Sequence, residues 1–184
     1  MLDDASTADR IAATFVAARS HGRALEAFPG AVPPSLADAY RVQDAAIGRM
    51  TDAIAGWKVG RVLPPASERF GVDRLAGPIF ARSIVHDRGE APPSGLVYDG
   101  GFGAAEAEFV LRIGQSPAPG KKRYSLDDAA ALVDRLHVGI EIASSPLPTI
   151  NDLGPTVIVS DFGNNNGLVI GPEIPDWRTT DYTH

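Results

Sequence analysis

The sequence contains no cysteine among its 184 residues, which excludes disulfides, thiolate metal sites and a cysteine nucleophile. That absence suits a reducing cytoplasm. No apolar run is long enough to span a bilayer, and the acidic N-terminus MLDDASTADR differs from a signal peptide, which begins basic and continues apolar. We therefore predict a cytoplasmic protein without a membrane segment.

Basic residues are in the minority as well. The formal net charge is −6, and no basic run or basic–aromatic stripe is present, so we expect no nucleic-acid partner. Hydrophobic residues make up 44% of the chain, which is enough to bury a core and typical of a globular protein. The length suits one large domain or two small ones.

Residue periodicity predicts helices first and mostly strands afterwards. Helices are expected over 7–22, from Ser35 onward, and over 126–137 behind a Ser125 cap. Extended segments are expected at 56–60, 77–85, 105–114 and 137–143, and residues 156–171 read as a strand or short helix, a loop and a strand. This pattern predicts an α+β fold, with a helical part at 1–55 and a β-rich body at 56–184.

Three carboxylates interrupt apolar strand sequence. Glu106 and Glu108 are two residues apart and so share one face of a strand, and Glu141 lies between two isoleucines in the next strand. Buried carboxylates are costly unless neutralised, and oxygen-only ligands select hard cations such as Mg²⁺, Mn²⁺ or Ca²⁺. The alternative is that Glu106 and Glu108 are ordinary residues on a solvent-facing strand.

Two further residues are candidates for catalysis. Lys58, in GWKVG, could bind a substrate carboxylate, exchange a proton or form a Schiff base, and it could equally be an exposed lysine at a strand edge. Asp161 follows an apolar run and precedes a turn-rich segment, so it is either a pocket residue or a turn former.

Several motifs, taken in order, resemble one known family. They are AARSHG, ADAYRVQDA, GWKVG, FGVDRLAGPIF, EAEFVLRIG, HVGIEIASS and VSDFGNNNGLVIG. Their order and spacing are similar to those of the 2-keto-4-pentenoate hydratases, which belong to the fumarylacetoacetate hydrolase superfamily together with the 4-oxalocrotonate decarboxylases. The resemblance covers nearly the whole chain.

The resemblance implies a rolled mixed β-sheet of the fumarylacetoacetate hydrolase C-terminal type with a small helical part before it. It implies a divalent metal, Mg²⁺ or Mn²⁺, held by Glu106, Glu108 and Glu141, with Lys58 close to the substrate. The implied activity is that of a metal-dependent hydro-lyase. Such an enzyme hydrates a 2-hydroxy-2,4-dienoate to a 4-hydroxy-2-oxo acid during the breakdown of aromatic compounds.

Three departures from the family pattern leave alternatives open. Residues 143–146 replace an Asp-Ser-Arg that many relatives carry, Leu75 and Ala76 stand where some hydratases have an acid, and relatives continue beyond His184. A 4-oxalocrotonate-type decarboxylase, an acylpyruvate hydrolase and a catalytically silent fragment or structural subunit therefore stay in consideration. Strands missing from the sheet would leave edges and apolar faces uncovered, so we expect a homo-oligomer or a complex with a decarboxylase of the same pathway.

Overall fold

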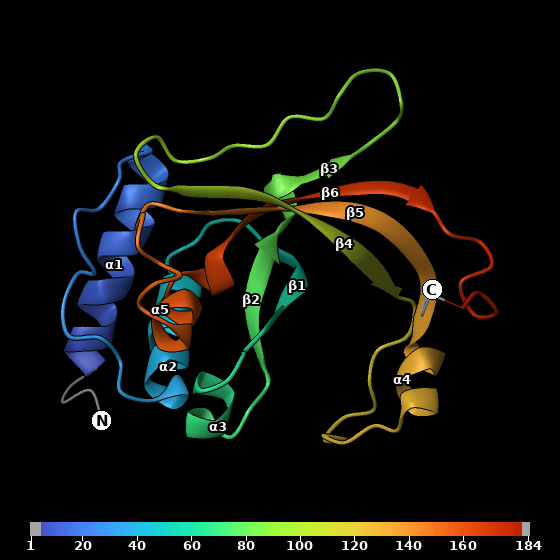
Figure 1. Cartoon of the computed structure of the whole chain (residues 1–184), viewed down its shortest axis with the longest axis horizontal. Helices are drawn as coiled ribbons and strands as arrows, with labels where there is room; N and C mark the ends of the chain where they lie inside the picture. The colour runs from blue at the N-terminus through green and yellow to red at the C-terminus, as the bar shows by residue number, and fades with distance from the viewer. Residues whose placement is uncertain (1–4, 182–184) are drawn as a thin grey trace.

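The structure is a computed structural model, and it describes residues 5–181. Helices and strands are both present, with a two-stranded and a four-stranded sheet. Figure 1 shows the larger sheet arching over the molecule, with most of the helices gathered below one end of the arch. The predicted α+β class is therefore confirmed.

The N-terminal part consists of two helices, α1 (Ala5–His21) and α2 (Leu36–Ile47), as the sequence predicted. Ser35 caps α2, because its side chain accepts a hydrogen bond from the backbone of Asp38 at 3.1 Å. A third helix, α5 (Pro155–Ser160), packs against α2. The shared core contains Ile11, Phe15, Val42, Phe80, Leu147, Ile150, Val157 and Phe162. This core draws on both sides of residue 55, and the domain boundary there stays a prediction.

A small antiparallel pair of strands follows the helical part. Strands β1 (Ile54–Arg61) and β2 (Arg74–Phe80) are connected through the short helix α3 (Ala66–Phe70), and Lys58 lies opposite Gly77. Side chains alternate along β1, so that Trp57 and Val59 are exposed while Lys58 is half-buried on the other face. The predicted strand at 56–60 is confirmed, and Lys58 faces into the molecule.

The larger sheet has the strand order β3-β6-β5-β4. Strand β3 (Ile84–His86) runs parallel to β6 (Asn165–Glu173). The long strand β5 (Val133–Ser145) pairs antiparallel with β6 on one side and with β4 (Phe102–Ile113) on the other. Figure 1 shows β4 and β5 curving from the side of α1 down toward α4 (Leu126–Leu132). The predicted rolled mixed sheet is thus present.

Two predicted boundaries are wrong. The helix expected over 126–137 ends at Leu132, because Val133 begins β5, where pairing with β4 and burial of Leu136 outweigh local helix propensity. The extended segment expected over 77–85 is interrupted after β2 by a 3₁₀ turn, η1 (Ala81–Ser83). The ambiguous segment 156–171 contains part of the short helix α5, then a 3₁₀ turn, η2 (Phe162–Asn164), and most of strand β6.

One face of the β4–β5 ladder exposes apolar side chains. They are Phe109, Leu111, Ile113, Val138 and Ile140, which lie on the sheet face opposite the one that carries Glu106. Exposed apolar surface of this kind is typical of faces that another chain or segment covers, and the homo-oligomer stays a prediction. Among residues 5–181, no helix combines the length and the apolar character needed to cross a membrane.

Candidate metal centre

The three predicted carboxylates come together on the inner face of the β4–β5 ladder. Glu106 lies directly opposite Glu141, and Glu108 lies opposite Gly139, so all three side chains share one face. One carboxylate oxygen from each lies within 4.8 Å of the others. Like charges placed this close repel, and a divalent cation between them would offset that repulsion.

Glu141 has the most unusual environment of the three. It is only 3% exposed, whereas Glu106 and Glu108 are open to solvent. Asn165 donates from Nδ2 to Glu141 Oε1 at 2.9 Å, and Lys58 Nζ lies 3.2 Å from Glu141 Oε2. Burial, and to a lesser extent the charge of Glu106, raises the pKa of Glu141, although Lys58 and Asn165 oppose that shift.

Lys58 reaches the carboxylates from a different sheet. Its side chain is 12% exposed, and Nζ donates to the carbonyl oxygen of Gly163 at 3.0 Å as well as pairing with Glu141. Lys58 is therefore not an exposed lysine at a strand edge. With all groups ionised, the three carboxylates and this ammonium carry a net charge of −2, which a divalent cation would neutralise. The donor set is entirely oxygen and fits Mg²⁺ or Mn²⁺.

Two glycines allow the η2 turn to approach Lys58. A Cβ atom at Gly77 would lie 2.0 Å from the carbonyl oxygen of Phe162, so only glycine fits at this point of β2. Gly163 has a φ of +67°, and a Cβ added to it would lie 3.1 Å from Gly77 Cα. The close backbone contact places the Gly163 carbonyl within reach of Lys58.

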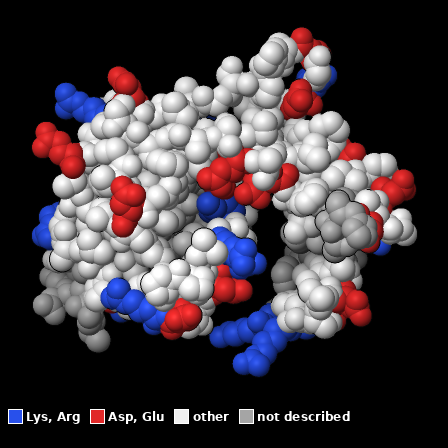
Figure 2. Space-filling view, in the orientation of Figure 1, with Lys and Arg blue, Asp and Glu red and all other residues white. Residues whose placement is uncertain are grey.

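Glu108, Glu141 and Lys58 line an open cleft. Its volume is about 1010 Å³, and residues of β1, β4, β5 and β6 line it, including Lys58, Glu108, His137, Glu141 and Asn165. Figure 2 shows the hollow between the part that carries β1 and β2 and the part that carries α4, with acidic and basic side chains at its rim. Glu106 and Glu108 are thus accessible to a small molecule, and Glu141 lines the cleft although little of it is exposed.

Asp161 lies in a different environment from the three glutamates. It is 1% exposed and is not among the residues that line the cleft. Arg19 Nε donates to its Oδ1 at 2.6 Å, and the Ser145 hydroxyl donates to its Oδ2 at 2.6 Å. Both carboxylate oxygens therefore have protein partners. The catalytic role expected for Asp161 stays a prediction, and the contacts favour a structural one.

Sequence reasoning missed three residues that shape the site. Asn165 holds Glu141, Gly163 accepts from Lys58, and Arg19 contacts the chain on both sides of the η2 turn. Asn165 stands in an unbroken run of three asparagines, and Arg19 in a helix end rich in polar residues. Neither pattern by itself distinguishes a buried hydrogen-bonding residue from a solvated one, so the signal in the sequence was that these residues lie within motifs of the family resemblance.

The fold defined by these elements is the rolled α+β fold of the fumarylacetoacetate hydrolase type. Two solved structures of 4-oxalocrotonate decarboxylase from Pseudomonas putida G7 share it. The one complexed with calcium and acetate aligns with a TM-score of 0.68 and 21% identity, and the one complexed with magnesium and adipate with 0.67 and 20%. Each alignment covers 90% of this chain and 62% of the solved chain.

The fold that the sequence resemblance implies is thereby confirmed. The chain spans 62% of the length of the two solved structures. No protein-family model and no curated protein sequence matches it significantly.

Proposed function

We propose that the chain binds Mg²⁺ or Mn²⁺ through Glu106, Glu108 and Glu141 and acts on a small 2-oxo or 2-hydroxydienoic acid. The observation that carries the proposal is the convergence of three carboxylates within 4.8 Å beside an almost buried lysine in an open cleft. A carboxyl group whose pKa is raised by burial, as that of Glu141 is, in a cleft beside other ionisable groups is typical of functional sites. The metal complexes of the two similar structures support the same assignment.

A bound divalent cation would supply Lewis-acid stabilisation of the negative charge that develops on an α-oxo acid. The protein's own groups have separate tasks. Lys58 Nζ, held by Glu141 and the Gly163 carbonyl, can bind the substrate carboxylate or move a proton. Asn165 and Lys58 each contact one oxygen of Glu141 and so fix its orientation, and each of those oxygens keeps a further lone pair for a cation.

Two reactions fit this site. Hydration of a 2-hydroxy-2,4-dienoate, as in the breakdown of aromatic compounds, is the reaction implied by the sequence resemblance. Decarboxylation of a 2-oxo-dioate is favoured by the similar structures, both of which are 4-oxalocrotonate decarboxylases. Both reactions develop negative charge on the C2 oxygen, so the same carboxylates and lysine would serve either of them.

Calorimetric titration with MgCl₂ tests metal binding directly. We expect a saturable heat in the wild-type protein that is lost in Glu106→Gln, because one of the three ligands is then neutral. Glu68→Gln removes the same charge from an exposed position on α3 and is expected to bind like the wild type. No saturable heat in the wild-type protein would contradict the proposal and favour the catalytically silent alternative.

Product analysis then separates the two reactions. With Mg²⁺ present, a hydratase consumes the conjugated diene without releasing gas, whereas a decarboxylase releases CO₂ from the dioate. We expect turnover of one substrate class and its loss in Glu106→Gln. Metal binding without turnover of either class would leave the metal site intact and refute the enzymatic part of the proposal.

A further inference from the structure

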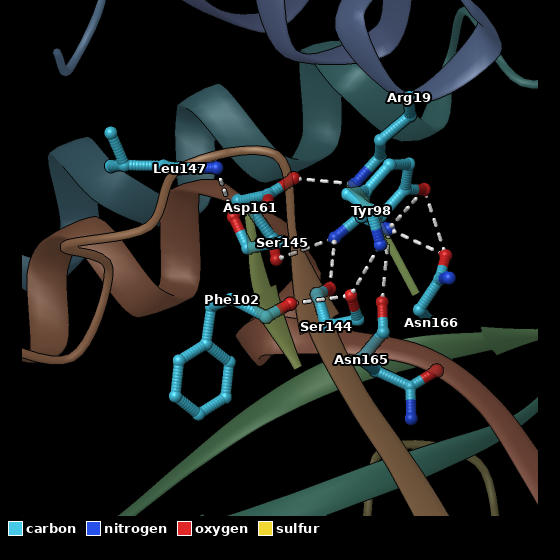
Figure 3. A network of polar contacts seen from close by, with 9 residues as sticks. All are labelled: Arg19, Tyr98, Phe102, Ser144, Ser145, Leu147, Asp161, Asn165 and Asn166. Carbon is cyan, nitrogen blue, oxygen red and sulfur yellow. Dashed lines mark hydrogen bonds and ion pairs between the residues drawn. The ribbon is translucent and has the colours of Figure 1, made fainter. Parts of the chain in front are cut away.

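A buried arginine lies at the centre of a polar network behind the candidate metal centre. Arg19 is in the last turn of α1, and its side chain is 8% exposed. The ion pair with Asp161 at 2.6 Å and the contact with Tyr98 outweigh the effect of burial and raise the pKa of Arg19, so the guanidinium is charged. As Figure 3 shows, it also donates to the carbonyl oxygens of Ser144 and Asn165 and to the side chain of Asn166.

This network surrounds a backbone turn of unusual conformation. The η2 turn has positive φ at all three of its residues, with +56° at Phe162, +67° at Gly163 and +67° at Asn164. Residues other than glycine rarely adopt this left-handed region, and they persist there only where their surroundings hold them. Something outside the turn must therefore fix it.

Arg19 contacts the two residues that flank the turn and the ring of the turn's first residue. Its Nη2 donates to the carbonyl of Asp161, which precedes the turn, at 3.3 Å. Its Nη1 donates to the carbonyl of Asn165, which follows the turn, at 3.1 Å. Its guanidinium carbon lies 4.9 Å from the centre of the Phe162 ring. The planar guanidinium can make these contacts together because its donors point in fixed directions.

The same turn supports the metal centre from its other side. The Gly163 carbonyl accepts from Lys58 at 3.0 Å, and Asn165 donates to Glu141 at 2.9 Å. Within residues 5–181, the hydrogen bonds that hold the side chains of the Lys58–Glu141 pair, apart from their contact with each other, therefore come from the segment that Arg19 holds. A displacement of this segment would move both contacts at once.

We propose that Arg19 is a positioning residue, which fixes the η2 turn and through it the orientation of Lys58 and Glu141. Asp161 and Ser145 orient the guanidinium in turn, since the Ser145 hydroxyl holds the second oxygen of Asp161 at 2.6 Å. This inference rests on the proposed function, because it assigns Arg19 a role in the same metal centre. It also assigns Asp161 a positioning role rather than contact with substrate.

Arg19→Lys tests the role with the charge retained. Lysine can keep the ion pair with Asp161, but one ammonium cannot span the carbonyls on both sides of the turn. We expect Mg²⁺ affinity, measured by calorimetry, to fall by roughly tenfold or more, since groups that orient metal ligands typically contribute that much. In the metal-free protein we expect amide hydrogen exchange at 162–165 to accelerate, while α2 stays protected.

Ile11→Val is the matched control for stability alone. Ile11 is fully buried in the same helix, and it belongs to the core cluster rather than to the polar network. Should Arg19→Lys fail to fold, Asp161→Asn keeps the shape of the partner while removing its charge, and the same changes are expected. The comparison is made where Arg19→Lys and Ile11→Val lower the melting temperature by similar amounts. The inference is overturned if Mg²⁺ affinity and amide exchange at 162–165 then change no more in Arg19→Lys than in Ile11→Val.

The two proposals can fail separately. If the wild-type protein does not bind Mg²⁺, the proposed function fails, and the exchange measurement alone decides whether Arg19 holds the turn. If the wild-type protein binds Mg²⁺ and Arg19→Lys binds equally well with unchanged exchange, the metal centre stands and the positioning role is refuted.

Discussion

The close contact between β2 and the η2 turn gives the sharpest prediction, through Gly77→Ala. The added Cβ would lie 2.0 Å from the Phe162 carbonyl oxygen, 2.5 Å from its carbon and 2.8 Å from the Gly163 nitrogen. An ordinary carbon–oxygen contact needs roughly 3.3 Å, so the two backbones must separate by about 1.3 Å. All three neighbours are backbone atoms, and no side chain can rotate away.

Overpacking of this kind typically lowers the free energy of unfolding by about 1–3 kcal/mol, and a backbone clash belongs at the upper end. The separation would also carry the Gly163 carbonyl away from Lys58, where the hydrogen bond is now 3.0 Å long. We therefore expect Gly77→Ala to lose about 3 kcal/mol and to weaken Mg²⁺ binding by roughly tenfold. Urea denaturation and calorimetric titration measure the two effects.

Gly56→Ala is the control on the facing strand. There the nearest atoms to an added Cβ are those of the Ile79 side chain, at 3.8 Å, which is ordinary contact. Loss of a flexible glycine from the unfolded chain would even stabilise this variant by about 0.4–1 kcal/mol. If Gly77→Ala were as stable as Gly56→Ala and bound Mg²⁺ as tightly as the wild type, the close approach of the turn would be refuted.

The remaining predictions concern charge and capping. Lys58→Met should lower turnover by roughly 10²–10⁴-fold, because the group proposed to bind the substrate carboxylate or move a proton is lost. Mg²⁺ binding should persist, because removal of a positive charge beside the carboxylates does not weaken their attraction for a cation. Because the pKa of Glu141 is raised, the folded protein binds this proton more tightly than the unfolded chain does. The stability gained in this way is complete at pH values below the ordinary pKa of glutamate, and it is lost as pH rises through the raised pKa. The free energy of unfolding of the metal-free wild type, relative to Glu141→Gln, should therefore fall across that pH range. Ser125→Ala should cost about 1 kcal/mol, because it removes the capping box with Asp128, and should leave Mg²⁺ binding unchanged.

Each of these has an opposing outcome. Full turnover in Lys58→Met would show that the lysine has no role in the reaction. A stability difference between wild type and Glu141→Gln that does not vary with pH would contradict the raised pKa. A change in Mg²⁺ affinity in Ser125→Ala would show that α4 is coupled to the metal centre, which the contacts of α4 do not suggest.

The sequence by itself predicted most of the local elements and singled out the three carboxylates. Alternation along a strand places Glu106 and Glu108 on one face whatever the rest of the fold does. The same local reasoning located the Ser35 cap and the strands that carry Lys58 and Glu141. Such features depend on residues a few positions apart, and the periodicity records them directly.

Only the tertiary structure decided which distant residues meet. The register that sets Glu106 opposite Glu141 brings together residues 35 positions apart, and the helix expected beyond Leu132 became strand because β4 lies beside it. Arg19 and Asn165 are separated by most of the chain, and their contact depends on the left-handed turn between α5 and β6. Long-range contacts of this kind are fixed by packing and hydrogen bonding across the whole molecule, and no local pattern in the sequence encodes them.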